Sequence, residues 1–425
     1  MTKLSVAQGT ALSIGAVLGT GVISMPALAA AVAGPASLVA WLALIVLSAP
    51  LAWSFAALGA RYPDGGGVST YVRLAFGPRA SAAVGWCFYF AIPLGAPPAC
   101  AFAGGYVADV LGGGHATRIA TFLAIVGSVF VMNWFGLRIS GRVQLWLTGM
   151  LAILLLVTVI AALPHAHRAN LHPFAPHGWS GIGAAAAVLV WGFAGWEALS
   201  SLSAEYRNPR RDVPRATGIA VVVVGALYLA VAVTSVLVLG PGLADSPAPL
   251  ADLLAIGLGG PVRVLTAIVA VLLTVGAVNA YLAGGSRLGP ALARDGALPS
   301  FINTPRRSLS LIGAGSLIAV TLPLSTNAAL LLVTGCFTLV YVLGTAAAVR
   351  LLPAGWSRVA AGTAFVATLA LLVLNGKPAL FSLAVALGAL VYQSRRAKIA
   401  SPSSSTAGSI APNPNTKPAI VEETL

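Results

Sequence analysis

Long stretches of this chain contain no charged residue, and they constrain its fold more than any other feature. None of the residues from Gln8 to Ala60 is Asp, Glu, Lys or Arg. Because a membrane-crossing helix needs about 20 predominantly apolar residues, this stretch can supply two crossings with a hinge at Gly34-Pro35. The composition agrees, since 58% of the 425 residues are hydrophobic and only 8% are charged. We therefore predict an all-α polytopic membrane protein.

The remaining charge-free stretches set the expected number of helices. Most of them are long enough for a single crossing at 1.5 Å rise per residue. Ser308–Val349 is longer and contains the turn signal PLSTN, so we divide it into two helices. Together with the first pair, these stretches predict twelve transmembrane helices. The single-crossing stretches are Ala80–Ala108, Ile119–Leu137, Val143–Pro164, Gly178–Trp196, Ala216–Ala244, Val264–Ser286, Val359–Gly376 and Pro378–Ser394.

The net charge of +14 could indicate a nucleic-acid partner, but basic residues in a polytopic chain usually report its topology. If the N-terminus lies inside, only four of the 24 lysines and arginines fall in outer loops, namely Arg118, Arg168, Arg263 and Lys377. This asymmetry follows the positive-inside rule. We expect both termini in the cytoplasm, no nucleic-acid partner, and a first helix that stays as an anchor rather than being cleaved.

Several classes of function are disfavoured by what the predicted crossings lack. They contain no histidine, so no Ser/His/Asp set can form within the membrane, and the chain has no GxxxxGK[ST] motif. We therefore expect neither an enzyme nor a primary pump, and no cofactor. The histidines near residue 170 are irregularly spaced, which is more typical of a solvated loop than of a metal site. All histidines fall in predicted outer loops: His115, His165, His167, His172 and His177.

The first crossing is interrupted by the glycine-rich stretch GAVLGTGVISMP, residues 15–26. In hydrocarbon every backbone N–H and C=O must be paired, so such an interruption survives where it lines a cavity. Unwinding at Gly19-Thr20-Gly21 would expose N–H groups that favour a carboxylate and carbonyls that favour an ammonium, a combination that suits a zwitterion such as an amino acid. Alternatively, Gly15 and Gly19 form a GxxxG motif that only lets two helices pack closely.

A second interruption lies in the sixth crossing, where Gly192 and Gly195 fall at mid-span beside Glu197. Glu197 is the only acid that we place inside the membrane. The two interrupted helices, the first and the sixth, occupy corresponding positions in two five-helix halves. This pattern is typical of transporters built from inverted repeats.

Four motifs resemble those of the amino acid/polyamine/organocation (APC) superfamily of permeases. They are GAVLGTGVISMPALAA (15–30), YPDGGGVSTYVRLAFG (62–77), GFAGWEALSSLSAEYRNPRRDVPRA (192–216) and SRLGPALARDGALP (286–299). The resemblance extends from the first to the eighth predicted helix. Within the superfamily, GTGVISMPALAA and ALSSLSAEYRNPRRDVPRA are most similar to bacterial exporters of L-methionine and branched-chain amino acids.

The resemblance implies a LeuT-like fold of two inverted five-helix repeats, residues 1–163 and 164–350. Helices 11 and 12 in 351–400 would be peripheral, and the Ser/Pro/Asn-rich tail 401–425 is expected to be disordered. The implied activity is alternating-access export of methionine, leucine, isoleucine and valine across the bacterial inner membrane. The alternatives are a proton-coupled uptake permease or exchanger of the same superfamily and, less favoured, a channel. The oligomeric state is left open.

The resemblance also implies which residues bind the substrate. Gly19, Thr20, Gly21 and Val22 would contact its carboxylate, and the backbone around Phe193, Ala194 and Gly195 would receive its amino group. Trp191 and Phe193 would be aromatic gates or pocket walls; alternatively they face lipid or the core. Near the breaks, the apolar residues Val22, Ile23, Phe193 and Trp196 favour a neutral aliphatic substrate.

Glu197 is the expected site of proton coupling or gating. Sodium-coupled relatives carry paired Ser/Thr in helix eight and some proton-coupled ones a lysine in helix five, and the corresponding spans here show neither. Glu197 aligns with an acid that the family ties to gating and pH response. A buried carboxyl is costly unless it is protonated or hydrogen-bonded, so its role is either proton exchange or a structural hydrogen bond. Glu205 is expected to pair with Arg207, Arg210 or Arg211.

Overall fold

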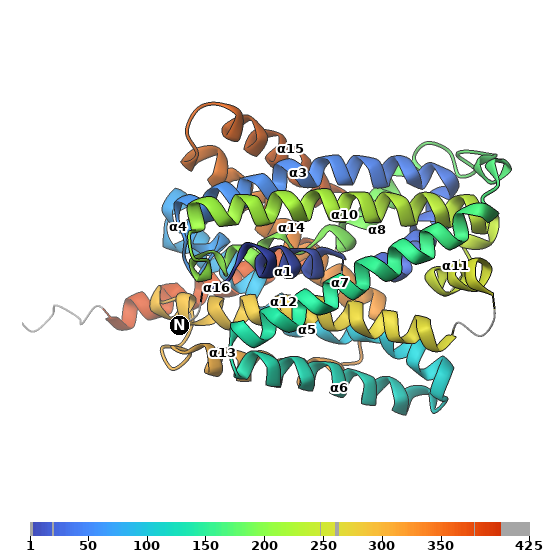
Figure 1. Cartoon of the computed structure of the whole chain (residues 1–425). Helices are drawn as coiled ribbons and strands as arrows, with labels where there is room; N and C mark the ends of the chain where they lie inside the picture. The colour runs from blue at the N-terminus through green and yellow to red at the C-terminus, as the bar shows by residue number, and fades with distance from the viewer. Residues whose placement is uncertain (1–2, 19–20, 247, 260–262, 378, 401–425) are drawn as a thin grey trace, which may run out of the picture.

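The computed structural model describes residues 3–18, 21–246, 248–259, 263–377 and 379–400. Most of its long helices run in roughly the same direction and form an elongated bundle (Figure 1). In the described ranges no strand occurs, and the only pairing of that kind is an isolated bridge between Leu4 and Tyr206. The all-helical class predicted from the sequence is confirmed.

The first half of the chain follows the predicted crossings closely. The hinge predicted at Gly34-Pro35 is a single 3-10 turn, in which Gly34 has a φ of +59°. A short helix, α4, follows the glycines of the second motif. The helices are α1 (Val6–Leu18), α2 (Gly21–Ala33), α3 (Ser37–Arg61), α4 (Val68–Phe76), α5 (Pro78–Leu111), α6 (Gly114–Trp134) and α7 (Leu137–Ala162).

The second half contains the other interrupted crossing and one helix that the sequence did not predict, α11. The predicted division within Ser308–Val349 is present, since α14 starts at Thr326 with the Ser325 side chain capping it. The helices are α8 (Gly181–Leu189), α9 (Trp196–Ser200), α10 (Pro209–Leu239), α11 (Pro249–Leu258), α12 (Arg263–Arg294), α13 (Pro305–Thr321), α14 (Thr326–Leu351), α15 (Trp356–Leu374) and α16 (Ala379–Ala400).

Within the described part of the chain, nine helices are long and apolar enough to cross a membrane. One of these spans, Ser24–Arg61, combines α2 and α3, which the hinge divides. Helix α1, with 13 residues, is among the shorter apolar helices. The chain is therefore a multi-pass membrane protein, and the count of twelve crossings stays a prediction.

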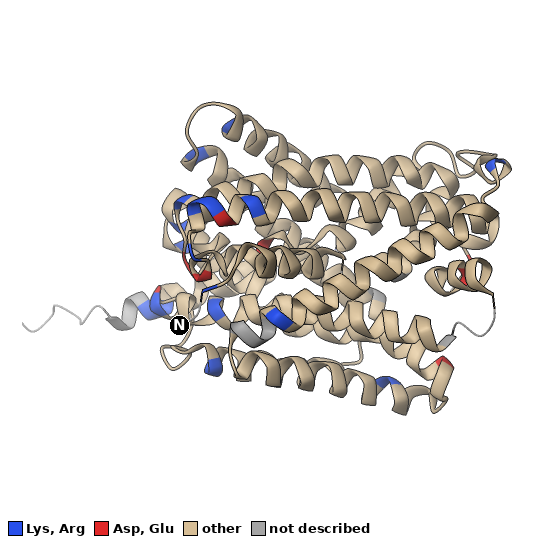
Figure 2. Cartoon of the chain, viewed as in Figure 1, with Lys and Arg blue, Asp and Glu red and all other residues tan. Residues whose placement is uncertain are grey.

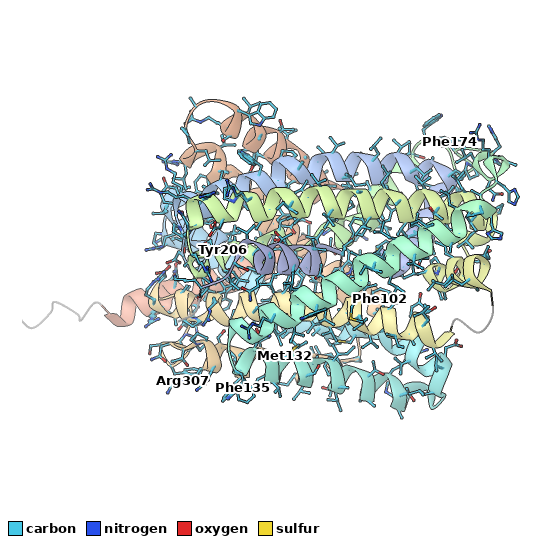
Figure 3. All side chains as sticks on the ribbon, in the orientation of Figure 1. Phe102, Met132, Phe135, Phe174, Tyr206 and Arg307 are labelled. Atoms are coloured by element: carbon cyan, nitrogen blue, oxygen red, sulfur yellow. The ribbon has the colours of Figure 1, made fainter. Side chains whose placement is uncertain are left out.

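The outer faces of the bundle are apolar, as expected for helices that contact lipid. On α7, Trp146, Ile153 and Ile160 are mostly exposed, whereas Leu151 and Leu155 are buried. Most lysines and arginines gather at the end of the bundle where the N-terminus lies (Figure 2). Figure 3 places Tyr206 and Arg307 at this end and Phe174 at the opposite one. We call it the basic end; its cytoplasmic orientation stays a prediction.

Candidate functional site

The sixth crossing is interrupted where its glycines predicted. Helix α8 continues into a 3-10 turn over Val190–Phe193, Ala194 is extended, and α9 begins only at Trp196. Gly195 has a φ of +142°, and a Cβ atom there would lie 2.9 Å from the carbonyl carbon of Ala16. Both the backbone conformation and the close approach of α1 require a glycine at this position. The second interruption therefore packs directly against the end of the first half-helix.

The structure describes the first crossing on either side of residues 19–20. Helix α1 is described to Leu18 and α2 from Gly21, and the predicted break at Gly19-Thr20-Gly21 falls on the two residues between them, so it stays a prediction. Two of the expected carboxylate-binding residues, Gly19 and Thr20, lie outside the described residues. Of the others, Gly21 is the first residue of α2, and Val22 is 1% exposed and packs in the hydrophobic core.

Tyr228, in the middle of α10, connects the last described turn of α1 to the interruption in the sixth crossing. Its hydroxyl oxygen lies 2.5 Å from the carbonyl oxygen of Val17, at the end of α1, and 2.5 Å from that of Gly192. A hydroxyl has only one hydrogen to donate, so the two carbonyls share it. The ring packs against Trp41 and Phe193, at centroid distances of 5.2 and 5.0 Å. The sequence shows only a lone tyrosine in an apolar span, and our sequence analysis missed it.

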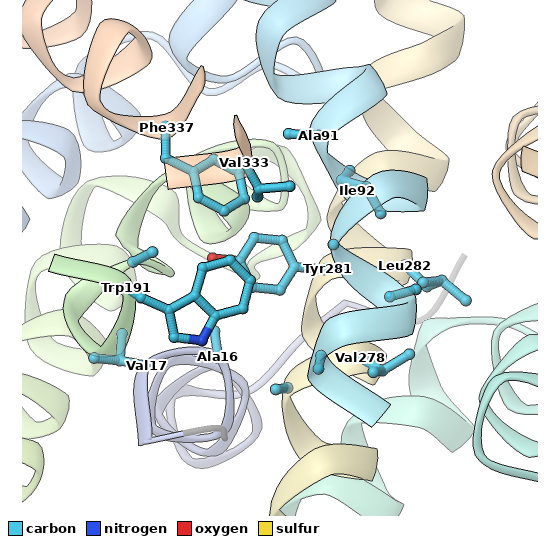
Figure 4. A pocket seen from close by; sticks show the side chains of 15 residues that line it. Ala16, Val17, Ala91, Ile92, Trp191, Val278, Tyr281, Leu282, Val333 and Phe337 are labelled. Atoms are coloured by element: carbon cyan, nitrogen blue, oxygen red, sulfur yellow. The ribbon is translucent and has the colours of Figure 1, made fainter. Parts of the chain in front are cut away.

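A cavity of about 50 Å³ lies beside the interruptions (Figure 4). It is larger than the space that one water molecule needs. Figure 4 shows the rings of Trp191, Tyr281 and Phe337 gathered at this cavity. None of the described residues that line it is charged. The lining residues are Ala16, Val17, Ala91, Ile92, Gly95, Ala96, Ala99, Trp191, Ala194, Ala277, Val278, Tyr281, Leu282, Val333 and Phe337.

The cavity brings together only some of the residues expected from the sequence. Trp191 and Ala194 line it, whereas Phe193 lies behind the break in the aromatic cluster with Trp41 and Tyr228. Val22 and Trp196 are buried elsewhere, and the side chain of Ile23 is not described. The surroundings are apolar as expected, but α5, α12 and α14 supply most of them. Side chains from these helices could not be assigned to the site without knowing how the helices pack.

Glu197 is fully buried and accepts hydrogen bonds from three neutral donors. Its Oε1 accepts from the Tyr281 hydroxyl at 2.9 Å. Its Oε2 accepts from the Gly195 N–H at 3.0 Å and from the Tyr341 hydroxyl. Within the described part of the chain, no cationic side chain pairs with this carboxyl. The acid thus joins the break in the sixth crossing to α12 and α14, through two tyrosines that sequence analysis did not single out.

The interior of α7 carries a neutral amide where a coupling lysine was sought. Gly15 of α1 leaves room for this side chain, since a Cβ there would lie 1.8 Å from Gln144 Nε2. The Gln144 Oε1 accepts from Asn279 Nδ2 at 2.8 Å, and Asn133 Nδ2 donates to Asn279 Oδ1 at the same distance. Thr148 donates to a carbonyl of α1 at 3.0 Å. Gly15 therefore allows close packing, as the GxxxG alternative held, both against the Gln144 side chain and against Gly276 of α12, whose carbonyl oxygen would lie 3.4 Å from a Cβ at Gly15.

Ion pairs join three of the motifs at the basic end. The Asp64 carboxylate lies 3.1 Å from both terminal nitrogens of Arg294 and also accepts from Thr70 and the Gly66 N–H. Partial burial alone would raise the pKa of Asp64, but these hydrogen bonds lower it below its usual value. Glu205 pairs with Arg287 at 2.8 Å.

The prediction that Glu205 pairs with Arg207, Arg210 or Arg211 is wrong, because its partner is Arg287. The reason is that the turn after α9 directs Glu205 toward the end of α12, where Arg287 is only 16% exposed at its side chain. Arg207, Arg210 and Arg211 follow Glu205 closely in sequence, but in the described structure none of them forms an ion pair with it.

No three His, Cys, Asp or Glu side chains come close enough to hold a metal ion in the part of the chain that the structure describes. Cys87, Cys100 and Cys336 are buried free thiols. At the cavity the described residues offer backbone groups at the break in the sixth crossing and at the end of α1, apolar walls, and one hydrogen-bonded carboxyl nearby.

Comparisons with known proteins agree with this architecture. A family model for amino acid permeases matches residues 4–403. The uncharacterized amino acid permease YecA of Bacillus subtilis is 33% identical over 316 residues, which are 72% of this chain and 74% of that protein. The L-methionine/branched-chain amino acid exporter YjeH of Escherichia coli is 39% identical over 232 residues, 53% of this chain and 54% of that one.

Among solved structures, MhsT in complex with L-phenylalanine has a similar fold, with a TM-score of 0.64. The similarity covers 88% of this chain and 99% of that chain, at 14% sequence identity. At this identity the likeness shows the fold alone.

Proposed function

The chain belongs to the amino acid permease family of the APC superfamily, and from that premise we propose that it is a secondary active transporter of neutral amino acids. It works by alternating access between two inverted five-helix repeats, residues 1–163 and 164–350, with residues 351–400 peripheral. Its place is the bacterial inner membrane, with both termini in the cytoplasm and most basic residues on that side.

The observation that carries this proposal is the cavity beside the broken sixth crossing and the end of α1, two segments that a single hydroxyl joins. Tyr228 contacts carbonyls of both segments, and Ala16, Val17, Trp191 and Ala194 line the cavity beside them. Interrupted helices place unpaired backbone groups at mid-membrane, where they can bind the two charged ends of a zwitterion without a charged side chain.

The substrate class follows from the walls of the cavity. A basic or acidic side chain would need a charged partner there, and the described lining has none, so its desolvation would not be compensated. Small residues such as Ala91 and Gly95 and branched ones such as Val278 and Val333 favour methionine, leucine, isoleucine and valine. We assign the carboxylate to the backbone of Gly19, Thr20, Gly21 and Val22, and the amino group to the backbone of Phe193, Ala194 and Gly195.

We infer export rather than uptake from the likeness to the methionine and branched-chain amino acid exporter. The second candidate, proton-coupled uptake or exchange, is favoured by the isolated carboxyl of Glu197, which neutral donors hold beside the break. A proton at this carboxyl would exchange one acceptor for a donor and so alter its bonds to Tyr281 and Tyr341.

The test is flux in liposomes that contain the purified full chain. Vesicles loaded with unlabelled leucine should accumulate labelled leucine or methionine by counterflow, because alternating access exchanges one substrate for another. Arginine and glutamate should compete at least about tenfold more weakly, since their charges would be buried unpaired. Passive equilibration without counterflow would indicate a channel. Equal competition by arginine would overturn the neutral-substrate assignment.

A further inference from the structure

A second, larger hollow of about 420 Å³ lies away from the transport site, between α3, α10 and α15. Its rim faces outward, because Val46 and Trp356 are 61% and 77% exposed. Its surface is apolar apart from two threonines. The volume falls in the range of about 300 to 1,000 Å³ that is usual for small-molecule sites. The lining residues are Val46, Leu47, Ala49, Pro50, Trp53, Thr217, Gly218, Val221, Trp356, Val359, Ala360 and Thr363. We call it the outer groove.

The outer groove lies toward the basic end of the bundle. It is lined by α10 residues 217–221, close to the start of a helix of 31 residues. Such a helix is about 46 Å long, whereas the hydrocarbon core is about 30 Å thick, so its first turns extend into the headgroup region. Tryptophans prefer that region. Two of them, Trp53 and Trp356, line the groove, and the Trp53 indole donates to Ser357 at 3.3 Å.

Two arginines stand below the groove on the same face of α10. Residues 211, 215, 218 and 222 follow the three- and four-residue spacing of one helix stripe. Arg211 and Arg215 are exposed, Gly218 lines the groove, and Val222 is 70% exposed. The stripe therefore changes from cationic to apolar within about two turns, as a surface at the boundary between headgroups and hydrocarbon would.

These two arginines lack an acidic partner in the described part of the chain. Arg287 and Arg294 at the same end are paired with Glu205 and Asp64, but no ion pair or side-chain hydrogen bond involves Arg211 or Arg215. The nearby Asp212 accepts instead from the Asn208 N–H at 3.0 Å. Unpaired arginines beside a hydrophobic groove at the membrane surface are complementary to an anionic phospholipid.

We propose that the outer groove binds one anionic phospholipid, with an acyl chain along α3 between α10 and α15 and the phosphate against Arg211 and Arg215. A second copy of the chain is a poorer occupant. A symmetric contact about an axis along the membrane normal would bring the arginines of both copies to the same level, where like charges repel. A lipid instead supplies both the apolar chain and the negative charge.

The bound lipid would reach the transport site through the helices that hold it. The groove walls α3 and α10 carry Trp41 and Tyr228, which pack together 5.2 Å apart, and Tyr228 contacts both interruptions. Filling the groove should therefore stabilise the pair α3 and α10 and change the rate of exchange. This last consequence rests on the proposed transport function, whereas binding itself does not.

The binding test uses the purified full chain in detergent with dioleoyl phosphatidylglycerol, dioleoyl phosphatidylcholine or glycerol phosphate as probes. Native mass spectrometry should detect one retained phosphatidylglycerol, and that lipid should raise the Tm in a dose-dependent way. Phosphatidylcholine and glycerol phosphate should do neither to a similar extent, because each lacks half of the required chemistry. Equal binding and stabilisation by phosphatidylcholine would overturn the proposal.

Two variants localise the site. Arg211→Gln with Arg215→Gln should weaken phosphatidylglycerol binding about 25-fold, at about fivefold for each arginine near the surface. Gly218→Leu should displace the acyl chain without disturbing the core, because a Cβ there meets nothing within 4 Å. Arg79→Gln, which removes another exposed arginine at the same end, is the control and should bind as the wild type does.

Each other outcome also decides the question. If Gly218→Leu and the double arginine variant retain wild-type lipid binding, the outer groove is not the site. If Gly218→Leu halves the mass measured by light scattering, the groove holds a second copy of the chain and the lipid proposal is wrong. If these variants lose lipid binding but retain counterflow, the outer groove is the lipid site, and the bound lipid does not influence transport.

Discussion

The acidic residues at the basic end of the bundle and the acidic residue in its interior have different partners. At the basic end, Asp64, Glu205 and Asp295 each lie within 3.2 Å of an arginine nitrogen. In the interior, Glu197 is fully buried, and the partners described for its carboxyl are neutral: two tyrosine hydroxyls and the Gly195 N–H. A carboxyl group is thus paired with a cation in one region and is hydrogen-bonded by neutral donors in the other.

The difference teaches what each region can do. An arginine can reach water from the bundle end at small cost, and an ion pair there holds its partner ionised. A carboxyl that only neutral donors hold can gain or lose a proton without leaving a buried cation unpaired. The ion pairs at the basic end are therefore suited to holding the motifs together. The carboxyl in the interior is suited to a change of protonation. Four predictions test this contrast.

The largest effect is expected for Gly195→Ala. A methyl group there would lie 2.9 Å from the Ala16 carbonyl carbon, on a residue with a φ of +142°. Either α1 moves or the break changes, so leucine exchange in liposomes should fall to background. Gly149→Ala on α7 is the matched control, since its Cβ meets nothing within 4 Å. Wild-type exchange by the Gly195 variant would show that the close packing of the two interruptions is not needed.

Glu197→Gln should remove the pH dependence of transport while leaving exchange at least partly intact. The amide keeps the shape and stays neutral at every pH, so the change of protonation is lost. Net flux and exchange are measured from pH 5 to 8 at matched protein density. Tyr281→Phe and Tyr341→Phe should each shift the midpoint of the wild-type profile rather than remove it. An unchanged profile in the Gln variant would make Glu197 a structural residue only.

If Glu197→Gln loses exchange at every pH, a binding measurement still separates a role in proton gating from a structural role. Thermal stabilisation by leucine then reports whether binding survives in the Gln variant. Retained stabilisation would place the defect in the conformational step, as proton gating requires. Lost stabilisation would mean that the hydrogen bond to Gly195 shapes the break, which is the structural alternative.

Tyr228→Phe should lower exchange about fivefold. The ring keeps its packing against Trp41 and Phe193, and only the hydroxyl that joins Val17 and Gly192 is removed. One hydrogen bond contributes about 1 kcal/mol, which corresponds to this factor. The control is Tyr106→Phe, because the Tyr106 hydroxyl bonds no described residue. Equal effects of the two variants would remove Tyr228 from the site.

The smallest effect is expected for Asp64→Asn at the basic end. The Arg294 side chain is 54% exposed, so the pair should contribute less than about 1 kcal/mol. Because the pKa of Asp64 is lowered in the folded protein, its stabilising contribution is present above the ordinary carboxyl pKa. It is lost only as the pH falls through the lowered value. The transport profile from pH 5 to 8 should therefore be unchanged, and a shifted profile would contradict the contrast drawn above.

The parts of the site that sequence reasoning found are those with a local signal. Gly195 and Glu197 stand out because a glycine and an acid are unusual in an apolar span, and Trp191 lies beside them. Tyr228 and Gln144 were missed because one aromatic or amide in a membrane helix is compatible with lipid contact, core packing or function. Phe193 was assigned to the pocket, but it packs behind the break, since residues two apart on an interrupted helix face different neighbours.

The sequence by itself determined that the chain is helical and crosses the membrane, and where its sixth crossing is interrupted. These properties depend on local chemistry, because hydrocarbon requires paired backbone groups and glycine permits their exceptions. Only the tertiary structure decided which side chains meet at the interruptions. Glu205 pairs with Arg287 rather than with its sequence neighbours, and Glu197 meets tyrosines 84 and 144 residues away. Such contacts depend on how the helices are rotated about their axes and packed against one another. The sequence does not specify this arrangement, because many apolar residues of similar hydrophobicity could face either lipid or a neighbouring helix.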